Sequence, residues 1–212
     1  MKATYGNNTQ NVELALVGVW DTVGALGIPN DLFEGLDSSI YGFLDTSLHP
    51  DVKAAVHALS IDERRSEFAP TLWTPNGSST LEQVWFSGVH ADVGGGYAET
   101  GLSDIALSWM IQKARGFGVQ FDPGAYATYT SVEAKHSLDQ LHTSWSLLWG
   151  FPKWRDVAAT SDLADSVGIR IANLTDYRPS DLQITGNSLN STYQTEYVVT
   201  SGPTPLTSAL ST

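Results

Sequence analysis

The sequence predicts an α/β fold, in which a mostly parallel β-sheet is flanked by helices. Two observations lead to this fold class. Continuous apolar runs rich in β-branched residues are typical of strands buried on both faces, and segments with helical apolar spacing alternate with them. Two predicted strands are too few for a stable parallel sheet. We therefore expect further strands on the N-terminal side, so that the sheet of this chain is incomplete.

The first strand and the first helix are predicted between residues 14 and 65. The run LALVGVW, Leu14 to Trp20, predicts a buried strand. The segment DTVGALGIPND that follows predicts a loop, because it holds two glycines, a proline and an Asn-Asp pair. Residues 49–65 predict a helix, since Pro50 suits a first helical turn and apolar residues between Val52 and Leu59 fall at three- to four-residue spacing.

A second strand and a second helix follow. The segment LEQVWFSGVH, Leu81 to His90, predicts the strand, and residues 102–118 predict a buried helix with Ser103 as its N-cap and two glycines at its end. From about residue 120 we expect irregular structure, with one short strand at TEYVVT. The aromatic segment 145–154 is interpreted as core, with a lid or a lipid-facing surface as the alternative.

Composition excludes several classes of function. Hydrophobic residues make up 42 % of the chain and charged residues 16 %, which is not the profile of a disordered protein. The net charge of −12 argues against nucleic acid as a partner, because the field of the protein would repel phosphates. The absence of cysteine excludes disulfides and thiolate chemistry. We find no signal peptide and no transmembrane segment, so the location expected by default is cytoplasmic, and export by a non-classical route stays open.

Two residues whose side chains can take part in acid–base chemistry directly follow the two predicted strands. Asp21 ends the first and His90 ends the second. In open α/β sheets the site lies outside the carboxyl ends of the strands, so an Asp and a His from two such ends can meet there. The Asp can fix the tautomer of the imidazole, and the free ring nitrogen can take a proton from a nucleophile. The alternative is that Asp21 is a turn or cap residue and that His90 is structural.

Metal and nucleotide sites have weaker support. His90 and Asp92 form an H-x-D arrangement that could bind a metal together with Asp21, but a second histidine at helical spacing is missing. The glycine run 94–96 has neither the G-x-G-x-x-G spacing nor the P-loop lysine. We therefore expect no metal and no organic cofactor.

Several long strings resemble, in order, the signature blocks of one α/β-hydrolase family. They are GVWDTVGALGIP, HALSIDERRSEFAPTLW, LEQVWFSGVHADVGGGY, LSDIALSWMI and YRPSDL. The family is that of the bacterial type VI secretion lipase effectors of the first class. The resemblance runs from about residue 12 to residue 182. It implies that residues 1–182 are the C-terminal portion of an α/β-hydrolase catalytic domain and that residues 183–212 are a Ser/Thr-rich extension.

The resemblance implies a serine esterase or phospholipase that acts on an ester or lipid substrate. Asp21 would be the acid of the catalytic triad and His90 its general base. Asp92 would brace the glycine turn. His57 and Arg64, on the predicted first helix, would have supporting roles, and His142 and Ser144 resemble a block near the mouth of the site.

The chain departs from the family in its nucleophile. In the family the serine lies upstream of the W-D-T-V block, on a G-F-S-R-G-like elbow, and no serine in this sequence has glycine two residues away on both sides. Three explanations are open: the sequence is a fragment, a second chain carries the serine, or the chain is a non-catalytic relative. We favour the first two. The prediction is thus a serine ester hydrolase whose nucleophile lies outside this chain, and the alternative is a binding or scaffold protein with the same fold.

Overall fold

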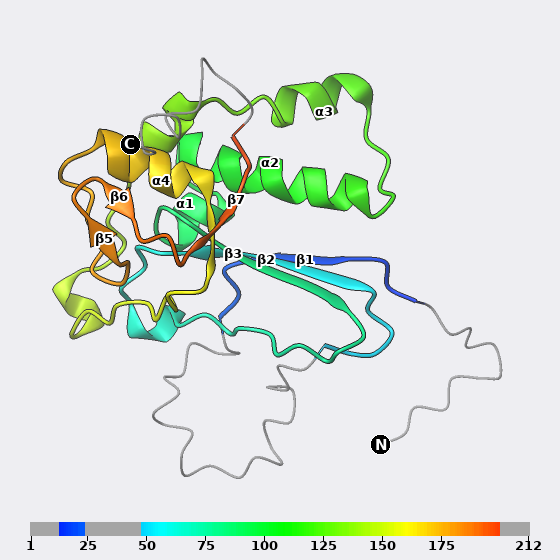
Figure 1. Ribbon diagram of the computed structural model, residues 1–212, viewed down its shortest axis with the longest axis horizontal. Coiled ribbons are helices and arrows are strands. Elements are labelled where there is room, and N and C mark those ends of the chain that lie inside the picture. Colours follow the sequence, from blue (N-terminus) through cyan, green and yellow to red (C-terminus); the bar gives the residue numbers. More distant parts are fainter. Residues whose placement is uncertain (1–12, 24–47, 200–212) are drawn as a thin grey trace, which may run out of the picture.

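The centre of the fold is a parallel β-sheet of five strands in the order β1-β2-β3-β4-β7. The computed structural model describes residues 13–23 and 48–199, and Figure 1 shows the sheet below a layer of helices. The predicted fold class, a mostly parallel sheet flanked by helices, is confirmed. The predicted loop between the first two strands lies mostly outside the described residues.

The three longest strands are neighbours at one end of the strand order. They are β1 (Val17–Trp20), β2 (Ala54–Ser60) and β3 (Thr80–Phe86). The first and third agree with the two predicted strands, although β3 ends four residues before His90.

The helix predicted at residues 49–65 is wrong, because these residues hold the central strand β2. Every residue of β2 is buried, and the strand pairs with β1 on one side and with β3 on the other. A parallel strand buried on both faces has a continuous apolar run, and three alanines and a histidine within it produced apparent helical spacing.

The predicted irregular region after residue 120 contains regular elements. The helix α3 (Pro123–Tyr129) begins after Asp122, whose side chain accepts a hydrogen bond from the backbone N–H of Ala125. The strand β4 (Asp162–Ala164) leads directly into the helix α4 (Asp165–Asn173). The remaining strands are β5 (Ile184–Thr185), β6 (Ser188–Leu189) and β7 (Gln194–Glu196). The last of these completes the main sheet and shares only Thr195 and Glu196 with the predicted TEYVVT strand.

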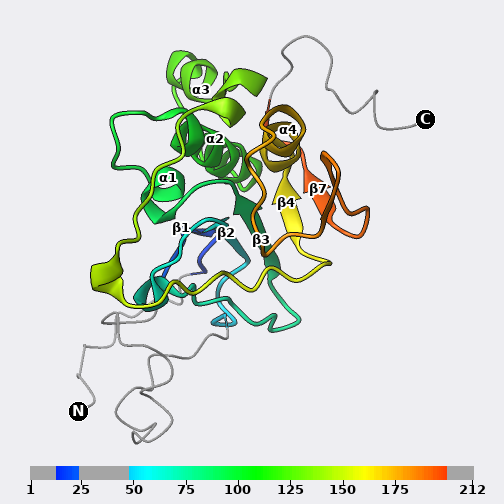
Figure 2. The ribbon, with the colours of Figure 1, turned by 90° about the vertical axis from the view of Figure 1, so that its left-hand side faces the viewer.

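The helices gather on one face of the sheet, as the two perpendicular views show (Figures 1 and 2). The helix predicted at residues 102–118 is confirmed as α2 (Gly101–Gly116), but its N-cap residue is Thr100 rather than Ser103. The short helix α1 (His90–Gly94) lies between β3 and α2 along the chain. Short 3₁₀ helices add three turns: η3 (Ser66–Phe68), η4 (Ala134–Leu138) and η5 (Leu147–Trp149).

The main hydrophobic core lies between the sheet and this helical layer. It includes Val56 and Ala58 of β2, Phe86 of β3, and Ile105 and Trp109 of α2. The rings of Phe86 and Trp109 meet edge to face with centroids 5.6 Å apart. A smaller cluster of Leu48, Val52 and Ala55 is separate from this core. This packing fixes the strands in register, so that the residues after β1, β2 and β3 emerge at one edge of the sheet.

Candidate active site

Asp21 lies at the carboxyl end of β1 and is fully buried. Its backbone φ is 38°, which is rare for a residue other than glycine and costs conformational energy. The carboxylate accepts hydrogen bonds from the backbone N–H and the hydroxyl of Ser60, both at 2.9 Å. The backbone N–H of Asp21 donates to the carbonyl of Ala58. These contacts with the end of β2 hold the carboxylate at the edge of the sheet.

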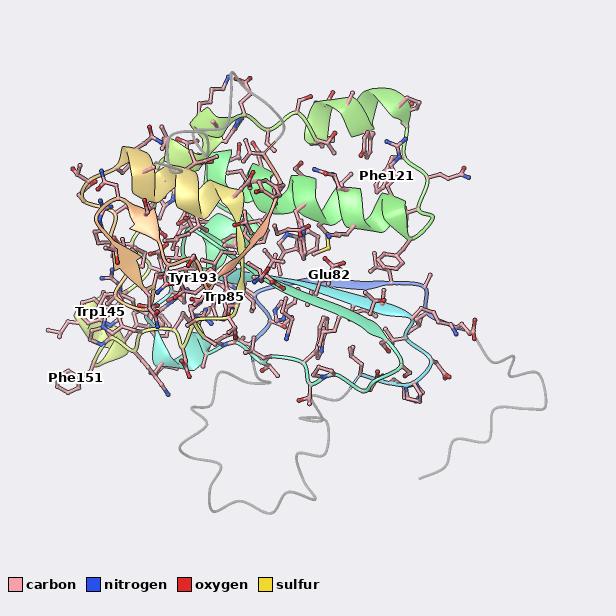
Figure 3. The ribbon with its side chains drawn as sticks, viewed as in Figure 1. Glu82, Trp85, Phe121, Trp145, Phe151 and Tyr193 are labelled. Atoms are coloured by element: carbon pink, nitrogen blue, oxygen red, sulfur yellow. The ribbon has the colours of Figure 1, made fainter. Side chains whose placement is uncertain are left out.

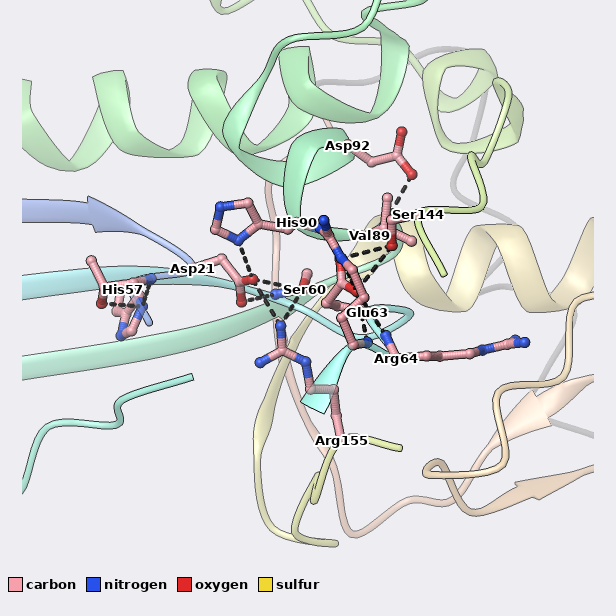
Figure 4. A network of polar contacts seen from close by, with 12 residues as sticks. Asp21, His57, Ser60, Glu63, Arg64, Val89, His90, Asp92, Ser144 and Arg155 are labelled. Carbon is pink, nitrogen blue, oxygen red and sulfur yellow. Dashed lines mark hydrogen bonds and ion pairs between the residues drawn. The ribbon is translucent and has the colours of Figure 1, made fainter. Parts of the chain in front are cut away.

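His90 opens α1 and extends its ring toward Asp21 (Figure 4). Its Nδ1 atom lies 2.8 Å from Oδ2 of Asp21. An ionised carboxylate can only accept, so Nδ1 carries the hydrogen and Nε2 presents a lone pair. Nε2 has no hydrogen-bond partner within the described ranges, and the side chain is 32 % exposed. The two predicted site residues therefore meet, with the second ring nitrogen available to another group.

Arg155 is a third member of this cluster that the sequence did not reveal. One terminal nitrogen of its buried guanidinium donates to Oδ2 of Asp21 at 2.8 Å and to the hydroxyl of Ser60 at 3.0 Å. Burial alone would raise the pKa of Asp21. The hydrogen bond from His90 and the charge of Arg155 outweigh burial and leave the pKa of Asp21 lowered. The carboxylate is thus kept ionised without contact with water.

Glu63 forms a second buried anionic centre behind His90. Its carboxylate pairs with Arg65 through two hydrogen bonds of 2.9 Å, and the single hydroxyl hydrogen of Ser144 is shared between its two oxygens, each 2.9 Å from Oγ. The backbone N–H of His90 also points to Oε2 of Glu63, at 3.3 Å. Burial would raise the pKa of Glu63, but the hydrogen bonds from Arg65 and Ser144 lower it to about 2. Glu63 therefore stays charged and fixes the start of α1.

Asp92 braces the turn at Gly88 and Val89, before α1, and also contacts His142. The prediction placed this role at the glycine run 94–96, but the side-chain hydrogen bonds of Asp92 within the described residues go to Val89 and His142. Its Oδ2 atom accepts hydrogen bonds from the backbone N–H groups of Val89 and His142, at 3.0 and 3.1 Å. Its Oδ1 atom lies 2.6 Å from Nδ1 of His142. A side chain at Gly88, which has a φ of 120°, would collide with Asp92. This turn thus requires both the glycine and the acid, and it orients α1 with His90 at its start.

His57 and Arg64 stand apart from the Asp21–His90 contact. His57 lies on β2, not on a helix, and its Nε2 atom accepts a hydrogen bond from the backbone N–H of Thr22 at 3.1 Å. Burial lowers the pKa of His57 to about 4, although the charge of Asp21 acts in the opposite direction. Arg64 stacks on the ring of Trp154, with 4.0 Å between its guanidinium carbon and the ring centroid. Both residues support the structure around the site.

A nearby hollow is too small for a lipid. It has a volume of about 210 Å³ and is lined by Arg65, Leu72, Trp85, Trp154 and Arg155 among others, but by neither Asp21 nor His90. Ligand pockets for small molecules usually measure about 300–1,000 Å³. In the described part of the chain, no group of three or more His, Asp or Glu side chains could hold a metal ion. No helix in that part is long and apolar enough to cross a membrane.

Comparison with known proteins finds a family whose model matches this chain. The model of the family described as "T6SS, Phospholipase effector Tle1-like, catalytic domain" matches residues 1–113, more than half of the chain. These residues include Asp21 and His90. No solved structure matches the chain.

One curated relative is a protein of Saccharomyces cerevisiae (strain ATCC 204508 / S288c) whose printed name is "Uncharacterized protein YEL023C". It is 34 % identical over 90 residues, which cover 40 % of this chain and 13 % of the yeast protein. The chain thus spans only a small part of the length of this relative. The family match over residues 1–113 places the chain in the family of Tle1-like phospholipase effector catalytic domains of type VI secretion.

Proposed function

We propose that this chain supplies the acid and the base of a serine ester hydrolase whose nucleophilic serine lies outside it. One observation carries the proposal: Nδ1 of His90 is hydrogen bonded to the buried carboxylate of Asp21, and Nε2 is left without a partner in the described residues. This is the arrangement of a general base that is oriented by an acid and ready for a nucleophile.

The proposed mechanism uses each member of the cluster in a defined way. The serine attacks the acyl carbonyl of the substrate while Nε2 of His90 accepts its proton. Asp21 holds the Nδ1–H group and stabilises the imidazolium that forms. The imidazolium then gives its proton to the leaving alcohol, and water, activated by His90 in turn, hydrolyses the acyl-enzyme. The oxyanion donors are assigned largely to the same part of the enzyme as the serine.

Arg155 and Ser60 act in this proposal through Asp21. Arg155 and the hydroxyl of Ser60 donate to Oδ2, the same oxygen that His90 contacts, and the backbone N–H of Ser60 donates to Oδ1. A carboxylate held in this way cannot rotate away from the imidazole, and the cation keeps it ionised in its buried position. They are positioning residues, because neither touches the proposed reacting atoms.

A phospholipid is the substrate class that the family favours. The matched family is described as a phospholipase effector, and a lipid ester provides the acyl carbonyl that the mechanism needs. The same family description supports export of the protein by a secretion system. The acyl chain and the headgroup that are cleaved depend on surfaces that the serine-bearing part would complete.

The proposal is tested by an assay of hydrolysis with and without a serine donor. The full chain is incubated with short-chain p-nitrophenyl esters and with phosphatidylcholine. It is assayed alone and then with a companion polypeptide, or an N-terminal extension, that carries a G-x-S-x-G motif. We expect hydrolysis only in the second case, and labelling of the companion serine by a fluorophosphonate probe.

Two results would contradict the proposal. If no companion produces hydrolysis or labelling, the scaffold alternative is favoured. If hydrolysis is present but is unchanged by Asp21→Asn and by His90→Gln, the assigned residues are wrong. His142→Gln is a suitable control, because it removes a neighbouring imidazole that does not contact Asp21.

A further inference from the structure

Three large apolar side chains project into solvent next to the candidate site. Leu147, Leu148 and Phe151 are 82 %, 97 % and 94 % exposed. We call them the apolar tip. They lie on and just after η5, which ends at Trp149 and is followed by Gly150. Figure 3 shows the ring of Phe151 at the edge of the molecule, pointing away from it. The interpretation of segment 145–154 as core is therefore wrong for this part of the segment.

The base of the apolar tip is held rigidly although its end is exposed. The ring of Trp149 meets that of Phe68 edge to face at 6.0 Å, and the guanidinium of Arg65 lies 3.5 Å from the centroid of Phe68. On the other side, Arg64 stacks on Trp154. Aromatic contacts at its base thus support the projecting tip.

The apolar tip is close to His90. The ring of Phe68 contacts Trp149 on one side and the imidazole of His90 on the other, with 5.1 Å between the centroids of Phe68 and His90. One aromatic ring therefore separates the base of the tip from the proposed general base. Any surface that receives the tip is brought to the side of the molecule on which His90 is exposed.

The charges around the tip select the kind of surface. Lys153, two residues after Phe151, is exposed, and its backbone N–H donates to the carbonyl of Arg64, so two cationic residues belong to the segments around the tip. Such cations can meet lipid phosphates while the apolar residues enter the acyl region. The net charge of the chain is −12, which opposes approach to an anionic membrane. The cationic residues near the tip and the negative net charge of the chain together favour binding to a surface that carries phosphates but has no net charge.

We propose that the apolar tip inserts into a zwitterionic phospholipid surface and so docks His90 at the lipid interface. The choice of a lipid as occupant rests on the proposed function. The docking itself needs no catalysis and no serine. Half-exposed tryptophans at the base, Trp149 and Trp154, suit the headgroup level, where indole rings are common.

The test measures binding of the full chain to phosphatidylcholine vesicles by flotation. We expect binding by the natural chain and a loss of about tenfold in affinity for each of Leu148→Ser and Phe151→Ser, since each removes an apolar side chain from the acyl region. The matched control is Val119→Ser. Val119 is 46 % exposed and lies two residues before Phe121, at the far end of the molecule from Phe151 (Figure 3). This control should bind as the natural chain does.

A second measurement covers variants that fail to fold. In a Phe151→Trp chain, brominated phosphatidylcholine should quench the added fluorescence on vesicle binding, while circular dichroism shows an unchanged fold. Several results would overturn the proposal: no binding to phosphatidylcholine vesicles, equal loss in the Val119 control, or binding only when phosphatidylserine is mixed in. A tip substitution that abolishes a dimer of the chain would assign the tip to a second copy instead.

Failure of this inference and failure of the proposed function are distinguishable. Vesicle binding without ester hydrolysis, even with a serine donor, would support docking at a lipid surface and contradict the proposed hydrolase function. Hydrolysis of a soluble p-nitrophenyl ester without vesicle binding would support the hydrolase function and contradict docking at a lipid surface.

Discussion

Two Asp–His pairs lie within the same small region and differ in what surrounds the imidazole. In the pair Asp21–His90, Nδ1 is 2.8 Å from a buried carboxylate and Nε2 has no partner within the described residues. In the pair Asp92–His142, Nδ1 is 2.6 Å from a buried carboxylate, and Nε2 is 3.3 Å from a carboxylate oxygen of Glu99. The first acid–imidazole contact leaves a nitrogen for chemistry, and the second does not.

The two imidazole rings also differ in exposure, and the ring of His142 is the less exposed. The His142 side chain is 13 % exposed and its ring is stacked on that of Tyr97, with centroids 3.7 Å apart. Burial would lower the pKa of His142, but the hydrogen bonds to Asp92 and Glu99 raise it overall. A ring held on both nitrogens and on one face serves as a connection between segments. An Asp–His contact therefore does not by itself identify a base; the state of the second nitrogen does.

The largest expected effect separates the two histidines by activity. In the enzyme assembled with a serine donor, His90→Gln should reduce kcat/KM on the order of 10³- to 10⁴-fold, because the general base is lost. His142→Gln should reduce it by less than about tenfold, since that ring does not contact Asp21 or the proposed reacting atoms. Steady-state hydrolysis of a p-nitrophenyl ester measures both. Equal losses in the two variants would remove the distinction between the pairs.

The next effect concerns Arg155, the cation that, among the described residues, contacts the acid of the first pair and not that of the second. Arg155→Met leaves the carboxylate of Asp21 buried with one cationic partner fewer, which should lower the free energy of unfolding by about 3–5 kcal/mol. Arg64→Met is the control. Its guanidinium stacks on Trp154 and makes no contact with Asp21, so about 1 kcal/mol is expected. Urea denaturation followed by tryptophan fluorescence distinguishes the two. A loss at Arg155 as small as that at Arg64 would show that Asp21 does not depend on this cation.

A third histidine sharpens the contrast by its response to pH. His57 has a folded-state pKa of about 4, against an ordinary value of 6.5, so the unfolded chain binds more protons between these values. Its contribution is therefore fully present above pH 6.5 and is lost as the pH falls toward 4, by about 3 kcal/mol in total. Comparing His57→Gln with the natural chain across this window should reveal that loss only in the natural chain.

The natural chain must be compared with His57→Gln because Asp62 changes stability with pH in the direction opposite to that of His57. Burial raises its pKa to about 6, so its contribution increases as the pH falls through that value. The difference between the variant and the natural chain cancels this effect. Parallel stability curves for the two chains between pH 7 and pH 4 would contradict a neutral His57.

The smallest expected effect weakens the second pair alone. Glu99→Gln removes one of the two carboxylates that raise the pKa of His142, so that pKa should fall, as measured by NMR titration of the ring protons. The stability contribution of a raised histidine pKa is present at acid pH and is lost as the pH rises. The variant should thus be destabilised by about 0.5 kcal/mol at acid pH and unchanged at alkaline pH. An effect at both pH values would indicate that Glu99 acts by packing rather than by charge.

The sequence was most informative where chain order and sheet geometry coincide. Asp21 and His90 each follow a strand, and parallel strands bring their carboxyl ends to one edge, so the proximity of the two residues could be predicted and is confirmed by the hydrogen bond. Their catalytic role stays a prediction. Strand β2 was missed because a buried alanine-rich run has no period that distinguishes a strand from a helix.

Other features could not be predicted, for reasons of distance or packing. Arg155 is 134 residues from Asp21 in a segment without regular structure, and no local pattern marks an arginine that pairs so far along the chain. The start of α3 was missed although Asp122 followed by Pro123 is a local signal for it, as a cap residue before a proline at the first helical position. The exposure of Leu148 and Phe151 contradicts the usual rule that aromatic and aliphatic clusters are core, and only the structure reveals it.

The bond between Arg155 and Asp21 has a consequence for the order of events during synthesis. Asp21 and His90 leave the ribosome well before Arg155, and the family match over residues 1–113 also ends before it. A nascent chain that has reached the end of α1 thus has its acid and its imidazole but not the cation beside the acid. The acid acquires its final environment only when the segment before β4 has packed against the sheet edge. The final environment of Asp21 therefore depends on completion of the chain through residue 155.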